Sequence, residues 1–68
     1  MTQLEIGAAR ERMLRAMFDC RGSEAERLRM RLMRTITTQE LWFARCDVYA
    51  LVSREHCESV AADRLRAD

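Results

Sequence analysis

The sequence predicts an all-α protein, built as a small helical hairpin or a three-helix unit that forms a homodimer. Its 68 residues include no proline and two glycines, and 49 % of them are apolar and 34 % charged. This composition is typical of a small helical domain. Apolar residues recur at spacings of three and four along the chain, which indicates helices with one buried face. We expect one domain over residues 1–68, with helices at about 3–21, 24–35 and 38–65.

The first helix is predicted from a capping pair and an apolar stripe. Thr2 and Glu5 have the three-residue spacing of a capping box, which satisfies backbone N–H groups at a helix start. Gly22 predicts the end of this helix, because glycine readily adopts the left-handed conformation that terminates many helices. The alternative is one long kinked helix, because Leu28 and Leu32 lie only slightly out of phase with the stripe. The stripe consists of Ile6, Ala9, Met13, Ala16, Met17 and Cys20.

Two further capping boxes bound the second helix and begin the third. Ser23 with Glu26 and Thr37 with Glu40 repeat the spacing of hydroxyl and carboxylate. The β-branched, hydroxyl-rich residues before Glu40 favour a turn. The apolar side of the second helix consists of Ala25, Leu28, Leu32 and Ile36. The paired methionines Met13, Met17, Met30 and Met33 are expected mostly in the core.

Nothing in the sequence interrupts the third helix, which at 1.5 Å per residue would be about 40 Å long. Its first apolar stripe consists of Leu41, Ala44, Val48, Leu51 and Val52. Its second, broader face carries Trp42, Phe43, Cys46, Tyr49, Ala50, Cys57 and Val60. A helix that is apolar on two sides needs two neighbours, so we expect the second face to pack on a second copy of the chain. The residues expected in the dimer interface or core are Leu41, Phe43, Val48, Leu51 and Val52.

Charge is distributed unevenly along a chain whose net charge is +1 and whose twelve basic residues are all arginine. Residues 21–34 carry five arginines against Glu24 and Glu26, a local charge of +3, whereas residues 40–68 carry −2. A row of arginines can contact phosphates, which leaves a nucleic-acid-binding regulator as an alternative. Because Glu24–Arg27 and Glu26–Arg29 are spaced as intrahelical pairs, we favour a solvated face or a contact with an acidic protein.

No metal site, cofactor site or catalytic centre is expected. Cys46 and Cys57 are eleven residues apart, about 16 Å along one helix, and the neighbours His56 and Cys57 diverge by about 100°. One metal ion therefore cannot join them within one chain, and a nucleophile with its base would need a different geometry. Three widely spaced cysteines fit buried thiols in a reducing cytoplasm. No apolar run is long enough to span a membrane.

Four segments resemble a family of small phage proteins, the quorum-sensing anti-activators. The segments are 27–35 (RLRMRLMRT), 41–42 (LW), 46–49 (CDVY) and 53–57 (SREHC). The resemblance implies a dimeric helical protein made in the cytoplasm of an infected bacterium. It also implies that the protein binds a LuxR-type transcriptional activator to block DNA binding, and that it can engage the pilus-assembly ATPase.

The predicted function is stoichiometric, noncatalytic binding of a host regulatory protein. Exposed aromatic and arginine side chains dominate many protein interfaces, so the expected partner-binding residues are Arg31, Arg34, Trp42 and Tyr49. A structural or assembly protein of a phage, without a regulatory target, is a further alternative.

Overall fold

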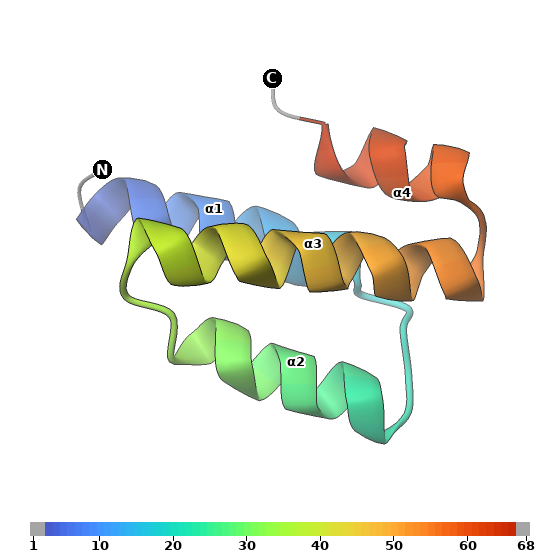
Figure 1. Cartoon of the computed structure of the whole chain (residues 1–68), viewed down its shortest axis with the longest axis horizontal. Coiled ribbons are helices and arrows are strands. Elements are labelled where there is room, and N and C mark those ends of the chain that lie inside the picture. Colours follow the sequence, from blue (N-terminus) through green and yellow to red (C-terminus); the bar gives the residue numbers. More distant parts are fainter. Residues whose placement is uncertain (1–2, 67–68) are drawn as a thin grey trace.

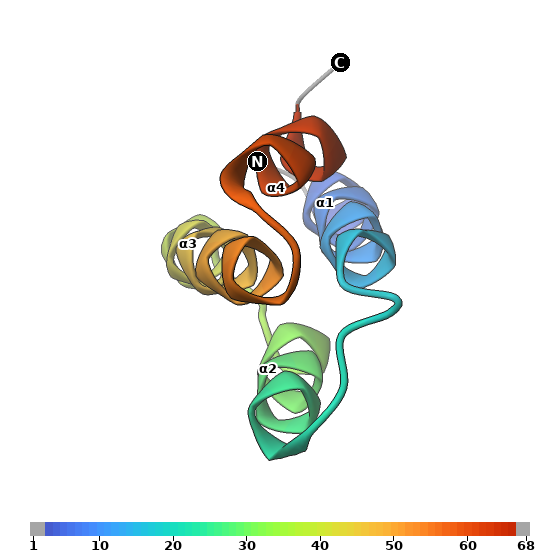
Figure 2. The same ribbon diagram turned by 90° about the vertical axis from the view of Figure 1, so that its right-hand side faces the viewer.

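The computed structural model describes residues 3–66, which form four α-helices and no strand. They are α1 (Gln3–Ala16), α2 (Ser23–Met33), α3 (Thr38–Glu55) and α4 (Glu58–Leu65). The prediction of an all-α protein is confirmed, but the predicted hairpin or three-helix unit has four helices. Helices α1 and α3 lie side by side, α2 packs on one side of this pair and α4 on the other (Figures 1 and 2).

The core is built from the apolar stripes that the sequence predicts. Every member of the first-helix stripe and of the first stripe of α3 is buried, as are Ala25, Leu28 and Leu32 of α2. Ile36 is an exception, because α2 ends at Met33 and leaves this side chain exposed in the turn that follows. The methionines divide in the same way: those of the first stripe are buried, whereas Met30 and Met33 are exposed.

The first two helices are separate, so the alternative of one long kinked helix is wrong. α1 ends at Ala16 rather than at residue 21, and Gly22 has a φ of 105°, a backbone conformation that favours glycine. Gly22 is also the N-cap of α2, and no side chain caps this helix. Ser23 and Glu26 therefore do not form the predicted capping box. The predicted Thr2–Glu5 box includes Thr2, which lies outside the described residues.

The predicted N-cap of α3 by Thr37 is confirmed, although the Glu40 side chain contacts the Thr37 hydroxyl rather than its N–H. Thr37 has extended backbone angles, and its hydroxyl oxygen accepts a hydrogen bond of 3.1 Å from the Glu40 N–H. The hydroxyl in turn lies 3.0 Å from Oε1 of Glu40 and donates to it. These contacts satisfy one of the unpaired N–H groups at the start of the helix.

The predicted helix 38–65 is wrong as a single element, because the chain turns back at residues 56–57. Cys57 has extended backbone angles and α4 begins at Glu58. No glycine or proline marks this turn. It allows Ala61 and Leu65 to be buried against the rest of the core, which a straight continuation of α3 would hold away from it. Burial of apolar surface therefore explains the break.

Part of the second face of α3 is covered by the chain's own α4 rather than by a second copy. α4 packs on α3, and Tyr49 of α3 and Val60 of α4 are partly buried against the core. Trp42, Phe43 and Cys46 stay exposed. The homodimer remains a prediction, with a smaller uncovered apolar face than the sequence indicated.

The two candidate caps give a matched pair of substitutions. We expect Thr37→Ala to lower the free energy of unfolding by about 1 kcal/mol, since a cap hydrogen bond is lost. Ser23→Ala should change it by less than half as much, because Ser23 caps nothing. Urea denaturation followed by circular dichroism measures both. Equal losses in the two variants would contradict this assignment of the caps.

Candidate functional site

An ion-pair cluster joins the C-terminal half of the chain to the end of α1. Asp19 follows α1, and its two carboxylate oxygens accept hydrogen bonds of 2.8 and 3.1 Å from Arg64 of α4. Nε2 of His56, at the end of α3, lies 2.9 Å from Asp19 Oδ2. The hydrogen bonds from Arg64 lower the pKa of Asp19 to about 2, and the carboxylate raises the pKa of Arg64 above its ordinary value. This Asp19 cluster fixes where α4 lies.

A groove remains where α4 stops. α4 has 8 residues, against 14 in α1 and 18 in α3, so α4 covers only part of the seam between the two longer helices (Figure 1). Beyond its last residues, the three helices border a cavity of about 220 Å³. We call this cavity the Trp42 groove. Its apolar lining consists of Ala9, Met13, Leu41, Trp42 and Leu65.

Four arginines and no acidic residue line the Trp42 groove. Arg64 is bound to Asp19, and Arg66 pairs with Asp63 at 2.6 Å. Arg45 lies over the Trp42 ring, 5.7 Å from its centroid, and donates to the Leu65 carbonyl at 3.3 Å.

Arg12, the fourth arginine of the groove, has no ion-pair or hydrogen-bond partner within residues 3–66. Arg45 has no carboxylate partner in the same part of the chain. Two positive charges at the groove are therefore uncompensated by the described residues. Sequence reasoning missed this set of arginines, because its members come from three helices and share no local pattern.

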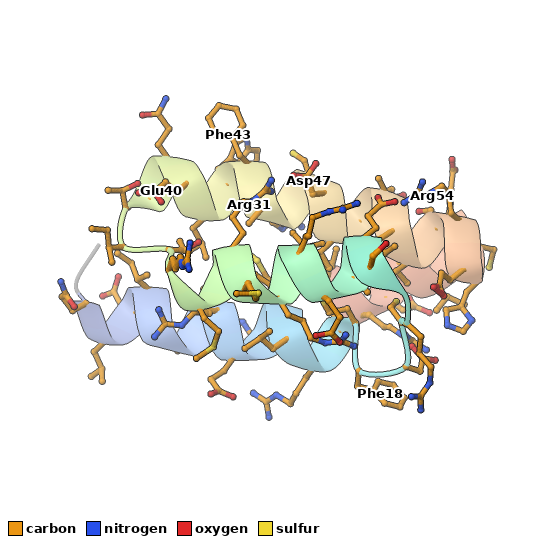
Figure 3. All side chains as sticks on the ribbon, turned by 90° about the horizontal axis from the view of Figure 1, so that it is seen from below. Phe18, Arg31, Glu40, Phe43, Asp47 and Arg54 are labelled. Carbon is orange, nitrogen blue, oxygen red and sulfur yellow. The ribbon has the colours of Figure 1, made fainter. Side chains whose placement is uncertain are left out.

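The structure does not bring the four predicted partner-binding residues together. Trp42 is 61 % exposed and borders the groove, whereas Tyr49 is partly buried against the core. Arg31 and Arg34 belong to α2 and its C-cap, across the α1–α3 pair from α4 (Figure 2). Among the five residues predicted for the core or dimer interface, only Phe43 is exposed, and it points away from the helix pair (Figure 3).

The predicted arginine row on α2 is largely engaged within the chain. Arg31 pairs with Asp47 of α3 (Figure 3). Arg29 pairs with Glu26 as the spacing predicts, and it also donates to the carbonyls of Met17 and Cys20 at 2.9 and 2.6 Å.

The other acidic residue of α2, Glu24, pairs with Arg54 of α3 rather than with Arg27. Arg21, Arg27 and Arg34 are exposed and have no ion-pair partner among residues 3–66. The basic surface of this region is therefore smaller than its local charge indicates.

The cysteines differ in burial and chemistry. Cys20 is buried, which raises the pKa of its thiol, whereas Cys46 and Cys57 are exposed, contrary to the expectation of buried thiols. A hydrogen bond with the Ser59 hydroxyl, 3.2 Å from the sulfur, lowers the pKa of Cys57, and the Val60 N–H acts in the same direction. Within the described part of the chain, no three histidine, cysteine or acidic side chains are grouped to hold a metal ion.

The chain matches no protein-family model, no curated protein and no solved structure. None of the described helices combines the length and the apolar character that crossing a membrane requires.

The lowered pKa of Asp19 makes part of the stability depend on pH. The folded-state pKa of about 2 lies below the ordinary value of 3.8, so the ionised carboxylate stabilises the fold at pH above about 4. This contribution is lost as pH falls from about 4 to 2. Denaturation of the parent protein and Asp19→Asn across this range should show a difference that is largest at neutral pH and vanishes near pH 2.

Asp63→Asn is the control, because it removes the carboxylate of an exposed pair between residues three apart at the end of α4. It should lower stability less than Asp19→Asn at neutral pH. A difference between Asp19→Asn and the parent that stays constant down to pH 2 would contradict the linkage.

Thiol reactivity should follow burial and pKa. We expect Cys57 to react with a disulfide reagent at pH 7.5 faster than Cys20, because the thiolate is the nucleophile and Cys20 is buried. Ser59→Ala should slow the reaction of Cys57 with the reagent, because it removes the hydrogen bond that favours the thiolate. Mass spectrometry of the labelled peptides assigns each rate, and faster labelling of Cys20 would contradict the prediction.

Proposed function

We propose that the chain is a noncatalytic protein-binding module that acts by covering a surface of another protein. One observation carries this proposal: seven large apolar side chains of the described residues are exposed. Five of them belong to the start of α1, the end of α2, the following turn and the first two turns of α3, which lie at one end of the molecule (Figure 1). Clusters of exposed apolar residues are typical of protein-binding surfaces. The five are Leu4, Met33, Ile36, Trp42 and Phe43.

The structural use of the reactive groups favours a binding role over catalysis. His56 contacts Asp19, and the Cys57 thiol contacts Ser59. The first contact joins the end of α3 to the turn after α1, and the second is a local contact at the start of α4. The two side chains therefore have structural partners that account for their positions.

The resemblance to phage quorum-sensing anti-activators supports a more specific form of the proposal. In this form the chain is made in the cytoplasm of an infected bacterium and forms a homodimer. It binds a LuxR-type transcriptional activator and prevents the activator from binding DNA. The pilus-assembly ATPase would be a second target.

Titration of the purified protein into a complex of a LuxR-type activator with its promoter DNA tests the specific form. We expect release of the DNA that is complete near a stoichiometric ratio, because the proposed mechanism is occlusion. DNA that stays bound at a large excess of the protein contradicts this form.

The general form is tested by retention of a defined protein partner after nuclease treatment of a bacterial lysate. Retention of nucleic acid alone, weakened by orders of magnitude between low and moderate salt, would instead support the arginine-row alternative. In that case the protein-binding proposal fails.

Substitution of an exposed aromatic residue should weaken capture of the partner. Trp42→Ala is expected to weaken binding at least about tenfold, since exposed tryptophans are frequent hot spots. Met30→Ala is the control, because Met30 is similarly exposed, 57 % against 61 % for Trp42, but is not one of the five residues of the proposed surface. Surface plasmon resonance with the captured partner measures both, with circular dichroism as a check of the fold. Equal affinities of the two variants would exclude Trp42 from the contact.

A further inference from the structure

We propose that the Trp42 groove is the docking site for an acidic, amphipathic helical segment of a partner protein. The inference rests on the proposed protein-binding function and assigns its site and the chemistry of the partner. The apolar face of this segment fills the groove, and its carboxylates pair with the surrounding arginines.

The shape of the groove indicates a helix. The seam between α1 and α3 already accepts one, because α4 buries Ala61 and Leu65 there. α1 and α3 are six and ten residues longer than α4, differences of about 9 and 15 Å at the rise of an α-helix. An entering helix that continues the line of α4 would therefore have room for about two turns.

The apolar floor of the groove indicates which residues the docked helix carries on its buried face. Met13 and Leu41 are buried beneath it, and Trp42 forms an exposed wall. Leucine or alanine side chains on one helical face would bury this surface, as Leu65 and Ala61 do in the neighbouring half of the seam. Methionine adapts its shape to different apolar side chains, so Met13 can pack closely against the side chains of the docked helix.

The positive charge of the groove indicates that the flanks of the docked helix are acidic. Four arginines and no carboxylate line it, and among residues 3–66 these arginines have only Asp19 and Asp63 as acidic partners. The guanidinium groups of Arg12 and Arg45 thus meet no carboxylate of residues 3–66. Arginine pairs with carboxylates through two parallel hydrogen bonds. Glutamate or aspartate on the flanks of the entering helix would supply these missing partners.

The same charges argue against a second copy of this chain docked groove to groove. A two-fold axis through the groove would bring Arg12 and Arg45 of both copies together. Juxtaposed like charges at an interface are strongly unfavourable. The acidic segment is therefore the better occupant.

The chain contains one tryptophan, so fluorescence of Trp42 reports directly on the groove. The probe is a library of fifteen-residue helical peptides, in which the core positions vary among apolar residues and the flanking positions vary among glutamate, glutamine and lysine. Peptides that bind the intact protein are selected and then titrated while Trp42 emission is recorded. We expect selected peptides to be enriched in glutamate at the flanks and to shift Trp42 emission.

Arg12→Glu is the decisive variant, because Arg12 is exposed and has no described partner whose loss would disturb the fold. It should weaken binding of the selected acidic peptides at least about tenfold by replacing an attraction with a repulsion. Arg27→Glu makes the same charge change on α2, on the opposite side of the α1–α3 pair. It should leave affinity within about twofold, and peptides with lysine flanks should recover binding to Arg12→Glu.

Several outcomes would overturn the proposal. These are selection of neutral or basic flanks, binding without a change in Trp42 emission, and equal losses in the two arginine variants. A dimer that Arg12→Glu dissociates, measured by light scattering, would assign the groove to a second copy instead. Peptides that bind without changing Trp42 emission contradict the assignment of the groove as the docking site, but they leave the proposed protein-binding function intact. Retention of no protein partner in the lysate experiment contradicts that function itself.

Discussion

Arginine side chains from other parts of the chain bind carbonyls at or just after the C-terminal ends of α1, α2 and α4. The last carbonyls of an α-helix lack partners within the helix, and a residue in the left-handed conformation often supplies them. Gly22 is the only residue with positive φ in the described chain, and it begins a helix. Instead, Arg64 donates to the last carbonyl of α1, and Arg29 donates to two carbonyls in the turn that follows α1. Arg10 donates to a carbonyl just past α2, and Arg45 donates to the last carbonyl of α4. These contacts tie α1 to α2 and α4, and α3 to α4.

At these four positions the geometry of the side chain favours arginine over lysine. A guanidinium presents five donors in a planar fork, whereas a lysine ammonium is a single compact charge. Arg64 donates to the Ala16 carbonyl and to both oxygens of Asp19. Arg29 similarly joins Glu26 to two carbonyls after α1. Lysine could not make these divergent hydrogen bonds from one position.

The features that the sequence predicts correctly are those that depend on residues close together in the sequence. Burial of the first stripe and of the α3 stripe follows from helical periodicity, and the Thr37 cap follows from a three-residue spacing. The turn at residues 56–57 lacks a local signal, because it depends on burial of Leu65 and on an ion pair between residues 45 positions apart. For the candidate site, the sequence identifies Trp42 but not its surroundings. The groove exists because α4 ends early, and Arg12 approaches Trp42 only through the packing of α1 on α3.

The short length of α4 has a consequence for motion. An isolated helix of 8 residues is not stable in water, because the cost of forming its first turn is not recovered over so short a length. α4 is therefore helical only while docked, and its departure from the core and its unfolding are one cooperative event. Breaking the contacts of Asp19 with Arg64 and His56 would release this unit while α1, α2 and α3 kept their mutual contacts. Amide hydrogens of α4 should accordingly exchange together through a local opening rather than through global unfolding.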